Sequence, residues 1–511
     1  MTSALLINWD NYPNIATGGV YTWSKILVEE LSDWNFVVLN QLSNANTNSN
    51  YALPENVKQV IELPIYGTFR CEEFCSGSAS VIPKIRRTTD SVIKKKFIPL
   101  FRSTLANLLS ESSDPDLLAH QIYGMHDFFR RYDWKKCFEH PSTLRAFLAH
   151  VHSDFLFSNL KLNEALPPYN MLKRGLQLLA IDIPPTDIVH ASNAWMPALV
   201  AIVAKIQNGS GVIITEHGIA FKELNLYINS SLTTIPSKMF WKIFARNMVR
   251  ALYAIADSIV TVSEANTLWE SSLGASRKKI KIVYNGVDTT KFSPIEDNKA
   301  LKKEFGVENT SRLVVASIGR VDFFKDIVCL ISAIRYIKRY IPNILCLHFG
   351  NGVDLKYSQQ CLRAVTELGV EDNFKFMGGT KQPEKAYRVG DVVAVSSITE
   401  GFPYVVIEAM ACGRAVVAAD VGGVREALEG CGVLVPSRSP SALGHGILTL
   451  LRDEKIRKQF EDLSLQRARD RFTLGRCVEQ YRYEYNRLYK KKIGSSYWLD
   501  NNHNLREEIP N

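Results

Sequence analysis

The sequence has little that is typical of membrane, fibrous or disulfide-stabilised proteins. It holds 29 glycines and 20 prolines among 511 residues, too few for a collagen-like or broadly disordered chain. Its longest apolar runs, such as Ala198–Ala204, fall far short of the ~18–20 residues that cross a membrane. The opening stretch, MTSALLINWD, has no basic segment, so no secretory signal is expected there. We therefore expect a globular, cytoplasmic protein.

The sequence also lacks the common metal and hydrolase signatures. Its nine cysteines are scattered, and the nearest pair, Cys71 and Cys75, has no matching histidine or second pair for a zinc site. Reduced thiols are therefore expected. No P-loop, HExxH or GxSxG motif is present, and no repeat of solenoid period. These absences remove the best-known nucleotide hydrolases, zinc proteases and serine hydrolases from consideration.

Length and composition predict a globular protein of several domains. Single cores stop growing near ~250–300 residues, so 511 residues predict two or three domains. Apolar residues make up 46% and charged residues 22%, an ordinary globular balance. The 61 basic and 52 acidic residues leave a net charge of +9, which does not by itself indicate a nucleic-acid partner.

The C-terminal half alternates short apolar strands with helical stretches. This alternation is typical of a parallel sheet covered on both faces. It predicts a Rossmann-like domain over 288–472, followed over 473–511 by a helix that could cross back to the first domain and by a polar tail. The expected strands are Arg312–Gly319, Asn343–Phe349, Phe374–Met377, Asp391–Ser396 and Ala415–Ala419.

The N-terminal half, residues 1–287, starts with the same pattern. A strand over Ala4–Trp9 leads through a glycine-bearing loop to a helix over Thr22–Leu31. A long insertion is expected at about 40–171. Later strands are expected at Asp187–His190, Gly211–Thr215, Ser258–Val262 and Lys281–Val283. The fold class is therefore α/β, with two Rossmann-like domains facing a cleft and ligands expected beyond the carboxyl ends of the strands.

The phrase SSITEGFPYVVIEAMACG carries the strongest chemical signal. A strand leads to Glu400, a helix is expected to begin near Pro403, and Glu408 lies within it. Eight residue steps place the two Cα atoms on the order of 10–12 Å apart along a helix axis, whereas a retaining glycosidase needs carboxylates about 5 Å apart. Two carboxylates that flank a helix N-terminus fit sugar, diphosphate and ribose in a row. The donor-binding residues expected between them are Gly401, Phe402, Pro403, Tyr404 and Val405.

Four further positions follow strands or open a domain. In SIGRVDFFKD, Arg320 and Lys325 follow a buried strand, where two cations could neutralise a diphosphate leaving group. In IITEHGI, His217 follows a strand, where it is either a structural residue or forms a hydrogen bond with the substrate. Asn285, in VYNGVD, is first a turn residue and second a ligand contact.

In NIATGGVYTWS, Gly18 and Gly19 lie between the first strand and its helix. Adjacent glycines let backbone N–H groups approach a phosphate, although a plain tight turn explains them equally well.

Two other segments resemble functional motifs. Asp114-Pro-Asp116 matches the Asp-x-Asp pattern of metal-dependent sugar transferases, but its place in a polar loop favours a turn or helix cap. Between Lys84 and Arg102 there are seven basic residues and one acid. This segment is either a solvated face or a site of attraction to an anionic membrane or an acidic partner.

Together these motifs resemble the family 4 retaining glycosyltransferases of the GT-B fold. The resemblance covers GRVDFFKD, FGNG, SSITEGFPYVVIEAMACG and DVGGVREAL in the C-terminal half, and the Gly-Gly loop and TEHG in the N-terminal half. Within that family, GGVYTWS, the long insertion and TEHGI look most like the PelF-type enzymes of Pel exopolysaccharide synthesis. Two positions depart from the PelF-like pattern: Leu224 interrupts a charged run, and Phe323–Phe324 replace a proline.

The resemblance implies roles for the residues above. Glu400 would contact the donor sugar, Glu408 the ribose, and Arg320 and Lys325 the diphosphate. Gly19 would approach the diphosphate from the other domain. His217 would touch the sugar near the reacting carbon.

The resemblance also implies a reaction. It is a metal-free, cofactor-free transfer of a hexose, with glucose favoured, from a UDP-sugar to a glycan or lipid-linked acceptor, with retention by front-face displacement. A membrane-embedded polysaccharide synthesis partner and a peripheral place at the inner face of the membrane would fit. Two other functions remain open: a UDP-sugar 2-epimerase of the same fold, and a non-catalytic nucleotide-sugar-binding subunit of a polysaccharide assembly.

Overall fold

The computed structural model describes residues 2–14, 18–44, 53–66, 70, 81–231 and 234–504. The chain forms two compact units. The first contains residues 1–261, 267–281 and 481–511, and the second contains 262–266 and 282–480. The end of the chain therefore belongs to the unit in which the chain begins.

The first unit is built on a seven-stranded parallel sheet in the order β3-β2-β1-β4-β5-β6-β7. Its strands are β1 Ser3–Trp9, β2 Asn35–Asn44, β3 Val57–Tyr66, β4 Ile188–Ala191, β5 Gly211–Glu216, β6 Ser258–Thr261 and β7 Ile280–Ile282. The order from β3 to β6 reverses direction between β1 and β4, which is the topological switch point where such sheets bind ligands.

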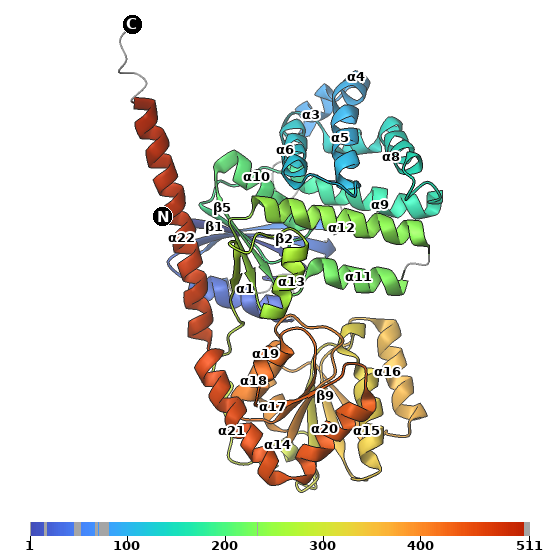
Figure 1. Ribbon diagram of the computed structural model, residues 1–511, viewed down its shortest axis with the longest axis vertical. Helices are drawn as coiled ribbons and strands as arrows, with labels where there is room; N and C mark the ends of the chain where they lie inside the picture. The colour runs from blue at the N-terminus through green and yellow to red at the C-terminus, as the bar shows by residue number, and fades with distance from the viewer. Residues whose placement is uncertain are drawn as a thin grey trace. The chain divides into compact units, whose positions relative to one another are not determined.

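Helices cover this sheet, and a group of them forms a separate layer. In Figure 1 the helices of residues 81–175, in blue to teal, gather beside α12 (Ile235–Ile255). Leu5 and Ile7, on one face of β1, belong to the same apolar core as Phe101 of this layer and Phe244 of α12. The first unit's helices are α1 Gly19–Glu30, α3 Val81–Arg87, α4 Asp90–Val92, the π-helical Ile93–Phe97, α5 Ile98–Leu108, α6 Pro115–Arg131, α7 Trp134–Glu139, α8 Pro141–Ser153, α9 Leu162–Gly175, α10 Leu199–Asn208, α11 Ala220–Ser231, α12 Ile235–Ile255 and, from Thr267 onward, α13 Glu264–Ser272, with short 3₁₀ turns at Leu176–Ala180 and Met196–Ala198.

The second unit has a six-stranded parallel sheet in the order β10-β9-β8-β11-β12-β13, with its switch point between β8 and β11. Successive residues of β11 face different cores: Val392 and Ala394 join one apolar cluster, and Val393 and Val395 join the other. The strands are β8 Val314–Ile318, β9 Leu345–Phe349, β10 Phe374–Gly378, β11 Val392–Val395, β12 Val416–Ala419 and β13 Val433–Val435. The helices are α14 Lys299–Glu304, the 3₁₀ turn Phe323–Lys325, α15 Ile327–Lys338, α16 Leu355–Glu367, α17 Pro383–Arg388, α18 Tyr404–Ala411, α19 Val424–Leu428, α20 Pro440–Arg452, α21 Glu454–Arg471 and the start of α22 Leu474–Asn504.

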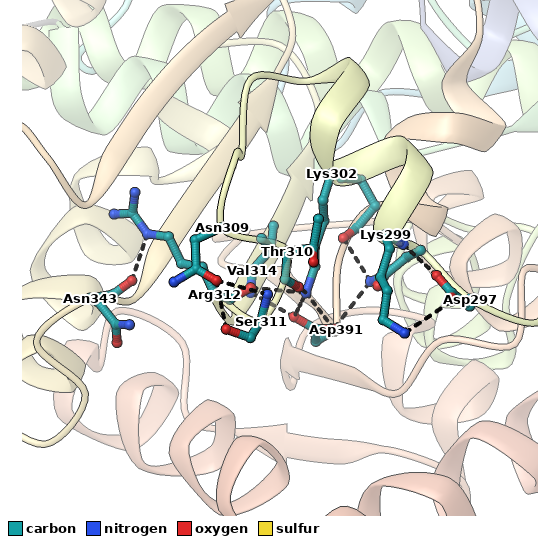
Figure 2. Close-up of polar contacts among 12 residues, drawn as sticks. Asp297, Lys299, Lys302, Asn309, Thr310, Ser311, Arg312, Val314, Asn343 and Asp391 are labelled. Carbon is teal, nitrogen blue, oxygen red and sulfur yellow. Dashed lines mark hydrogen bonds and ion pairs between the residues drawn. The ribbon is translucent and has the colours of Figure 1, made fainter.

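A buried ion pair fixes the amino ends of the two central strands of this sheet. Lys302 of α14, with 4% of its side chain exposed, lies 2.9 Å from Oδ2 of Asp391, which directly precedes β11. The same carboxylate accepts the backbone N–H of Val314, the first residue of β8, at 2.7 Å. Figure 2 shows Lys302 also donating to the carbonyls of Thr310 and Arg312. With its partners complete, Lys302 is structural.

The fold class expected from the sequence is confirmed, with differences at its edges. The strands expected in both halves are all present, whereas β2, β3 and β13 were not anticipated. We expected the insertion to begin at about residue 40, but the sheet continues there through β2 and β3. The helical layer itself occupies 81–175. The pattern of β2 misleads because its Asn40 and Gln41 are polar yet fully buried.

The residues from Tyr481 onward group with the first unit. Tyr481 and Tyr485 of α22 are buried, and the Tyr485 hydroxyl lies 2.9 Å from Nδ1 of His190 in β4. The Tyr485 ring also meets Trp34 edge-on at 5.0 Å. The C-terminal helix thus completes the core of the first unit.

Candidate functional site

Lys325 and Glu400 meet at the switch point of the six-stranded sheet. Lys325 ends the 3₁₀ turn after β8, and Glu400 lies in the loop after β11, the neighbouring strand. The Lys325 ammonium lies 2.5 Å from Oε1 of Glu400, with side-chain exposures of 22% and 11%. Arg320, in the same loop as Lys325, is half exposed and pairs with Asp322 at 3.0 Å. Two cations and a carboxylate therefore line the carboxyl edge of this sheet.

The loops that carry these residues are bonded to each other. The Asp322 side chain accepts the backbone N–H of Lys325 at 3.1 Å and so closes the 3₁₀ turn. Ser396 donates to the Lys325 carbonyl at 2.8 Å, and the Ile398 N–H donates to the Phe324 carbonyl at 2.8 Å. The separation of Lys325 from Glu400 is thus fixed by backbone contacts as well as by their own ion pair.

The loop Glu400–Pro403 is held from two further sides. The Gly423 N–H donates to the Gly401 carbonyl at 2.7 Å. Gly422, at φ +53°, lies so close that a Cβ there would be 1.8 Å from the Glu400 carbonyl oxygen, which only glycine avoids. On the other side, Asn285 donates from Nδ2 to the Phe402 carbonyl at 2.8 Å.

Asn285 therefore holds the loop in place. Its Oδ1 is buried and has no hydrogen-bond partner within the described parts of the chain.

Glu408 lies one turn into the helix that follows. Pro403 precedes α18, which begins at Tyr404 and includes Val405 in its first turn. The Glu408 carboxylate accepts the Tyr387 hydroxyl at 2.5 Å. Burial raises the pKa of Glu408 to about 7, although the Tyr387 hydrogen bond opposes this. Since first-turn N–H groups have no acceptor inside their own helix, an anion is favoured between the two carboxylates.

The first unit carries the other predicted residues, at the ends of its own strands. His217 directly follows β5, and its ring meets that of Trp23 of α1 edge-on at 4.5 Å. Burial lowers the pKa of His217 to about 3, so the ring is neutral at pH 7. Its Nε2 is buried without a hydrogen-bond partner in the described segments. A nitrogen of a neutral imidazole can accept a hydrogen bond from a substrate hydroxyl or donate one to it, depending on the tautomer.

Gly18 and Gly19 lie between β1 and α1. Gly18 has φ +92° and is the residue before α1, whose first residue is Gly19. A Cβ at Gly18 would meet none of the described residues within 4 Å, so the positive φ, and not crowding among them, requires glycine.

Several expectations lie outside these two strand edges. Asp114 accepts the N–H groups of Asp116 and Leu117 as the cap of α6, which confirms the helix-cap interpretation. The seven cysteines of the described residues are free and buried, and Cys71 and Cys75 lie outside those residues. No helix of the described ranges is long and apolar enough to span a bilayer.

Sequence reasoning missed three residues that orient the predicted ones. Tyr387 bonds Glu408 from 21 positions upstream, and no local pattern links the two. Trp23 reaches His217 across the first unit. Ser397, which donates to Oε1 of Glu400 at 2.6 Å, could have been noticed because it directly follows the Ser396 that ends the expected strand.

Both units have the Rossmann-like order, and both present polar groups at the carboxyl edge, so the fold is that of the GT-B proteins. Two solved structures agree. Sucrose-phosphate synthase from Thermosynechococcus elongatus matches with a TM-score of 0.62 at 17% identity, over 96% of this chain and 100% of that one. Anabaena HepE in complex with UDP and glucose matches with a TM-score of 0.60 at 17% identity, over 95% and 99%.

Three curated relatives carry glycosyltransferase names. Two are D-inositol 3-phosphate glycosyltransferases. That of Segniliparus rotundus is 38% identical over 52% of this chain and 58% of that protein, and that of Corynebacterium glutamicum is 30% identical over 55% and 68%. The third is the N-acetylgalactosamine-N,N'-diacetylbacillosaminyl-diphospho-undecaprenol 4-alpha-N-acetylgalactosaminyltransferase of Campylobacter jejuni, 29% identical over 48% and 67%. Matches to such relatives span between 49% and 68% of their lengths.

Two family descriptions cover most of the sequence. Residues 298–466 match "Glycosyl transferases group 1", and residues 4–278, more than half of the chain, match "Domain of unknown function (DUF3492)". The chain therefore belongs to the group 1 glycosyl transferases and carries a DUF3492 domain as its N-terminal half.

Proposed function

We propose that this protein is a retaining, metal-independent glycosyltransferase that moves a hexose, with glucose favoured, from a UDP-sugar to a glycan or lipid-linked acceptor. The observation that carries the proposal is the Lys325–Glu400 pair at the switch point, followed within one helix by Glu408. A cation, a helix N-terminus and two separated carboxylates complement diphosphate, sugar and ribose. The Anabaena HepE structures, in complex with UDP and glucose and with UDP-glucose, support a uridine nucleotide as the donor.

The cations account for leaving-group stabilisation without a metal ion. Lys325 and Arg320 would neutralise the charge that builds on the diphosphate as the glycosidic bond breaks. The neutral His217 would hydrogen-bond a sugar hydroxyl near the reacting carbon, and the Gly18–Gly19 turn would admit a phosphate to the N-terminus of α1. In the front-face mechanism the departing diphosphate itself accepts the acceptor's proton.

The acceptor and the cellular role are proposed on separate observations. A PelF-like role in exopolysaccharide synthesis rests on the motifs GGVYTWS and TEHGI. A lipid-linked acceptor is supported by the diphospho-undecaprenol in the name of the Campylobacter jejuni relative. The basic segment 84–102, which spans α3 to α5, would favour a peripheral place at the inner face of the membrane, beside a membrane-embedded synthesis partner.

A donor and acceptor panel tests the proposal. Thermal shifts with UDP-, GDP- and ADP-sugars should single out UDP-hexoses, because a bound donor stabilises the fold by mass action. UDP release is then measured with undecaprenyl-diphosphate glycans, free glucans and inositol 3-phosphate as acceptors. Release of UDP with transfer supports the proposal. A free epimer without transfer would indicate a 2-epimerase, and binding without turnover would indicate a non-catalytic subunit.

A further inference from the structure

Two consecutive serines follow the last residue of β11, and each holds a different residue of the candidate site. Ser396 and Ser397 are 4% and 1% exposed. The Ser396 hydroxyl donates to the backbone carbonyl of Lys325 at 2.8 Å. The Ser397 hydroxyl donates to Oε1 of Glu400 at 2.6 Å. One strand end thus fixes the backbone of the cation and the side chain of the carboxylate.

We propose that Ser397 is the positioning residue that keeps the Glu400 carboxylate aimed at the donor sugar once Lys325 has been drawn to the diphosphate. Ser396 has the complementary task of anchoring Lys325. This inference rests on the proposed function, because it assigns the sugar to Glu400 and the diphosphate to Lys325.

The placement of the donors on Glu400 supports this division. Both the Lys325 ammonium, at 2.5 Å, and the Ser397 hydroxyl, at 2.6 Å, meet Oε1. No hydrogen bond to Oε2 occurs among the residues that the structure describes. A carboxylate can accept bonds at both oxygens. The free capacity for a sugar hydroxyl therefore lies at Oε2, and the orientation of Oε2 is set by what holds Oε1.

Donor binding changes that balance. A diphosphate carries more charge than one carboxylate and offers several acceptor oxygens, so it competes for the Lys325 ammonium. When Lys325 turns to the diphosphate, Ser397 is the remaining hydrogen-bond donor to Oε1 among the described residues. Ser397 is well suited to hold Oε1 because it is buried and its backbone is anchored. Its carbonyl accepts a hydrogen bond from the Ser437 hydroxyl at 3.3 Å. Loss of the hydroxyl would let the carboxylate rotate in the state where its aim matters.

The two serines therefore predict opposite binding signatures. Ser397→Ala should leave UDP affinity within twofold of wild type, but lower the ratio of UDP-glucose affinity to UDP affinity tenfold or more. Ser396→Ala should weaken UDP and UDP-glucose alike, because it loosens Lys325. Ser397→Thr, which restores a hydroxyl, should recover the ratio to within threefold. Ser332→Ala, which removes a hydroxyl bonded to Val328 within α15, is the matched control and should bind as wild type does.

Isothermal calorimetry with UDP and UDP-glucose measures these ratios. Equal losses of UDP affinity in Ser396→Ala and Ser397→Ala, or a Ser397→Ala ratio like that of wild type, would overturn the proposal. So would a Thr variant no better than the Ala variant.

A second measurement needs no ligand. Thermal unfolding of Ser397→Ala, Glu400→Gln and the double variant forms a cycle that isolates the contact between the two side chains. Non-additive shifts are expected. If the wild-type protein binds UDP-glucose but the unfolding shifts are additive, the role of Ser397 alone is overturned. If the wild-type protein binds none of the sugar nucleotides, the proposed function is overturned and this role with it.

Discussion

Two lysine–carboxylate pairs of the second unit, Lys302–Asp391 and Lys325–Glu400, should respond differently to the loss of the lysine. Lys302 is 4% exposed and donates to a carboxylate and two carbonyls, so Lys302→Ala leaves Asp391 buried without its cation. Breaking such a pair costs about 3–5 kcal/mol. For a unit of this size that corresponds to a fall in Tm on the order of 10 °C.

Lys325 is the matched partner in this comparison. Its side chain is more exposed than that of Lys302, at 22% against 4%, and Ser397 still donates to Glu400 Oε1 without it, so Lys325→Ala should cost less stability than Lys302→Ala. The same change would remove the charge-assisted contact to the diphosphate that we propose, so UDP affinity should fall by about ten- to a hundredfold.

Scanning calorimetry and UDP titration of both variants are the assays. Equal losses of stability would refute the assignment of one lysine to the scaffold and the other to the site. Unchanged UDP affinity in Lys325→Ala would refute the assignment of Lys325 to the diphosphate.

Three other predictions concern the donor. In calorimetry, Glu408→Gln should weaken UDP binding by about tenfold, whereas Glu400→Gln should leave UDP affinity unchanged or higher. In a radiolabelled transfer assay, Glu400→Gln should abolish sugar transfer. Equal losses of UDP affinity in the two variants would contradict their separate roles. Burial raises the pKa of Glu408 to about 7, and the proposed contact with the ribose hydroxyls uses its ionised form, so UDP affinity should rise from pH 6 to pH 8 and level off above. This rise should be absent in Glu408→Gln, and a rise of equal size there would assign it to another group. Transfer should persist in excess chelator; loss restored by manganese would contradict metal independence.

The neighbourhood of Lys325 and Glu400 was predictable, because both follow strands whose carboxyl ends share one edge of a parallel sheet. The helix start after Pro403 was predictable for a similar reason, since proline favours a first turn. What the sequence could not supply is tertiary side-chain pairing. Tyr387 reaches Glu408 from another helix.

In the seven-stranded sheet, the two strands at one end, β3 and β2, were harder to predict than the central ones. β2 and β3 carry buried or alternating polar residues, such as Asn40, Gln41 and Glu62, that resemble loop composition. Asn40 donates to the Asn11 carbonyl and to Asn14, so its polarity serves the loop after β1. Composition shows that a segment is polar, but not that its polar groups are satisfied internally.

The return of the chain to its first unit constrains how the protein is made. Tyr481, Tyr485 and Leu488 are buried in a core whose other walls are formed within the first 281 residues. On the ribosome, the second unit, 262–266 and 282–480, has its whole sequence once residue 480 has been made, whereas the first unit still waits for the part of α22 from Tyr481 onward. Until then Trp34 and His190 lack their covering rings, so nascent chains stalled or truncated before residue 481 should depend on chaperones and be the first targets of proteolysis.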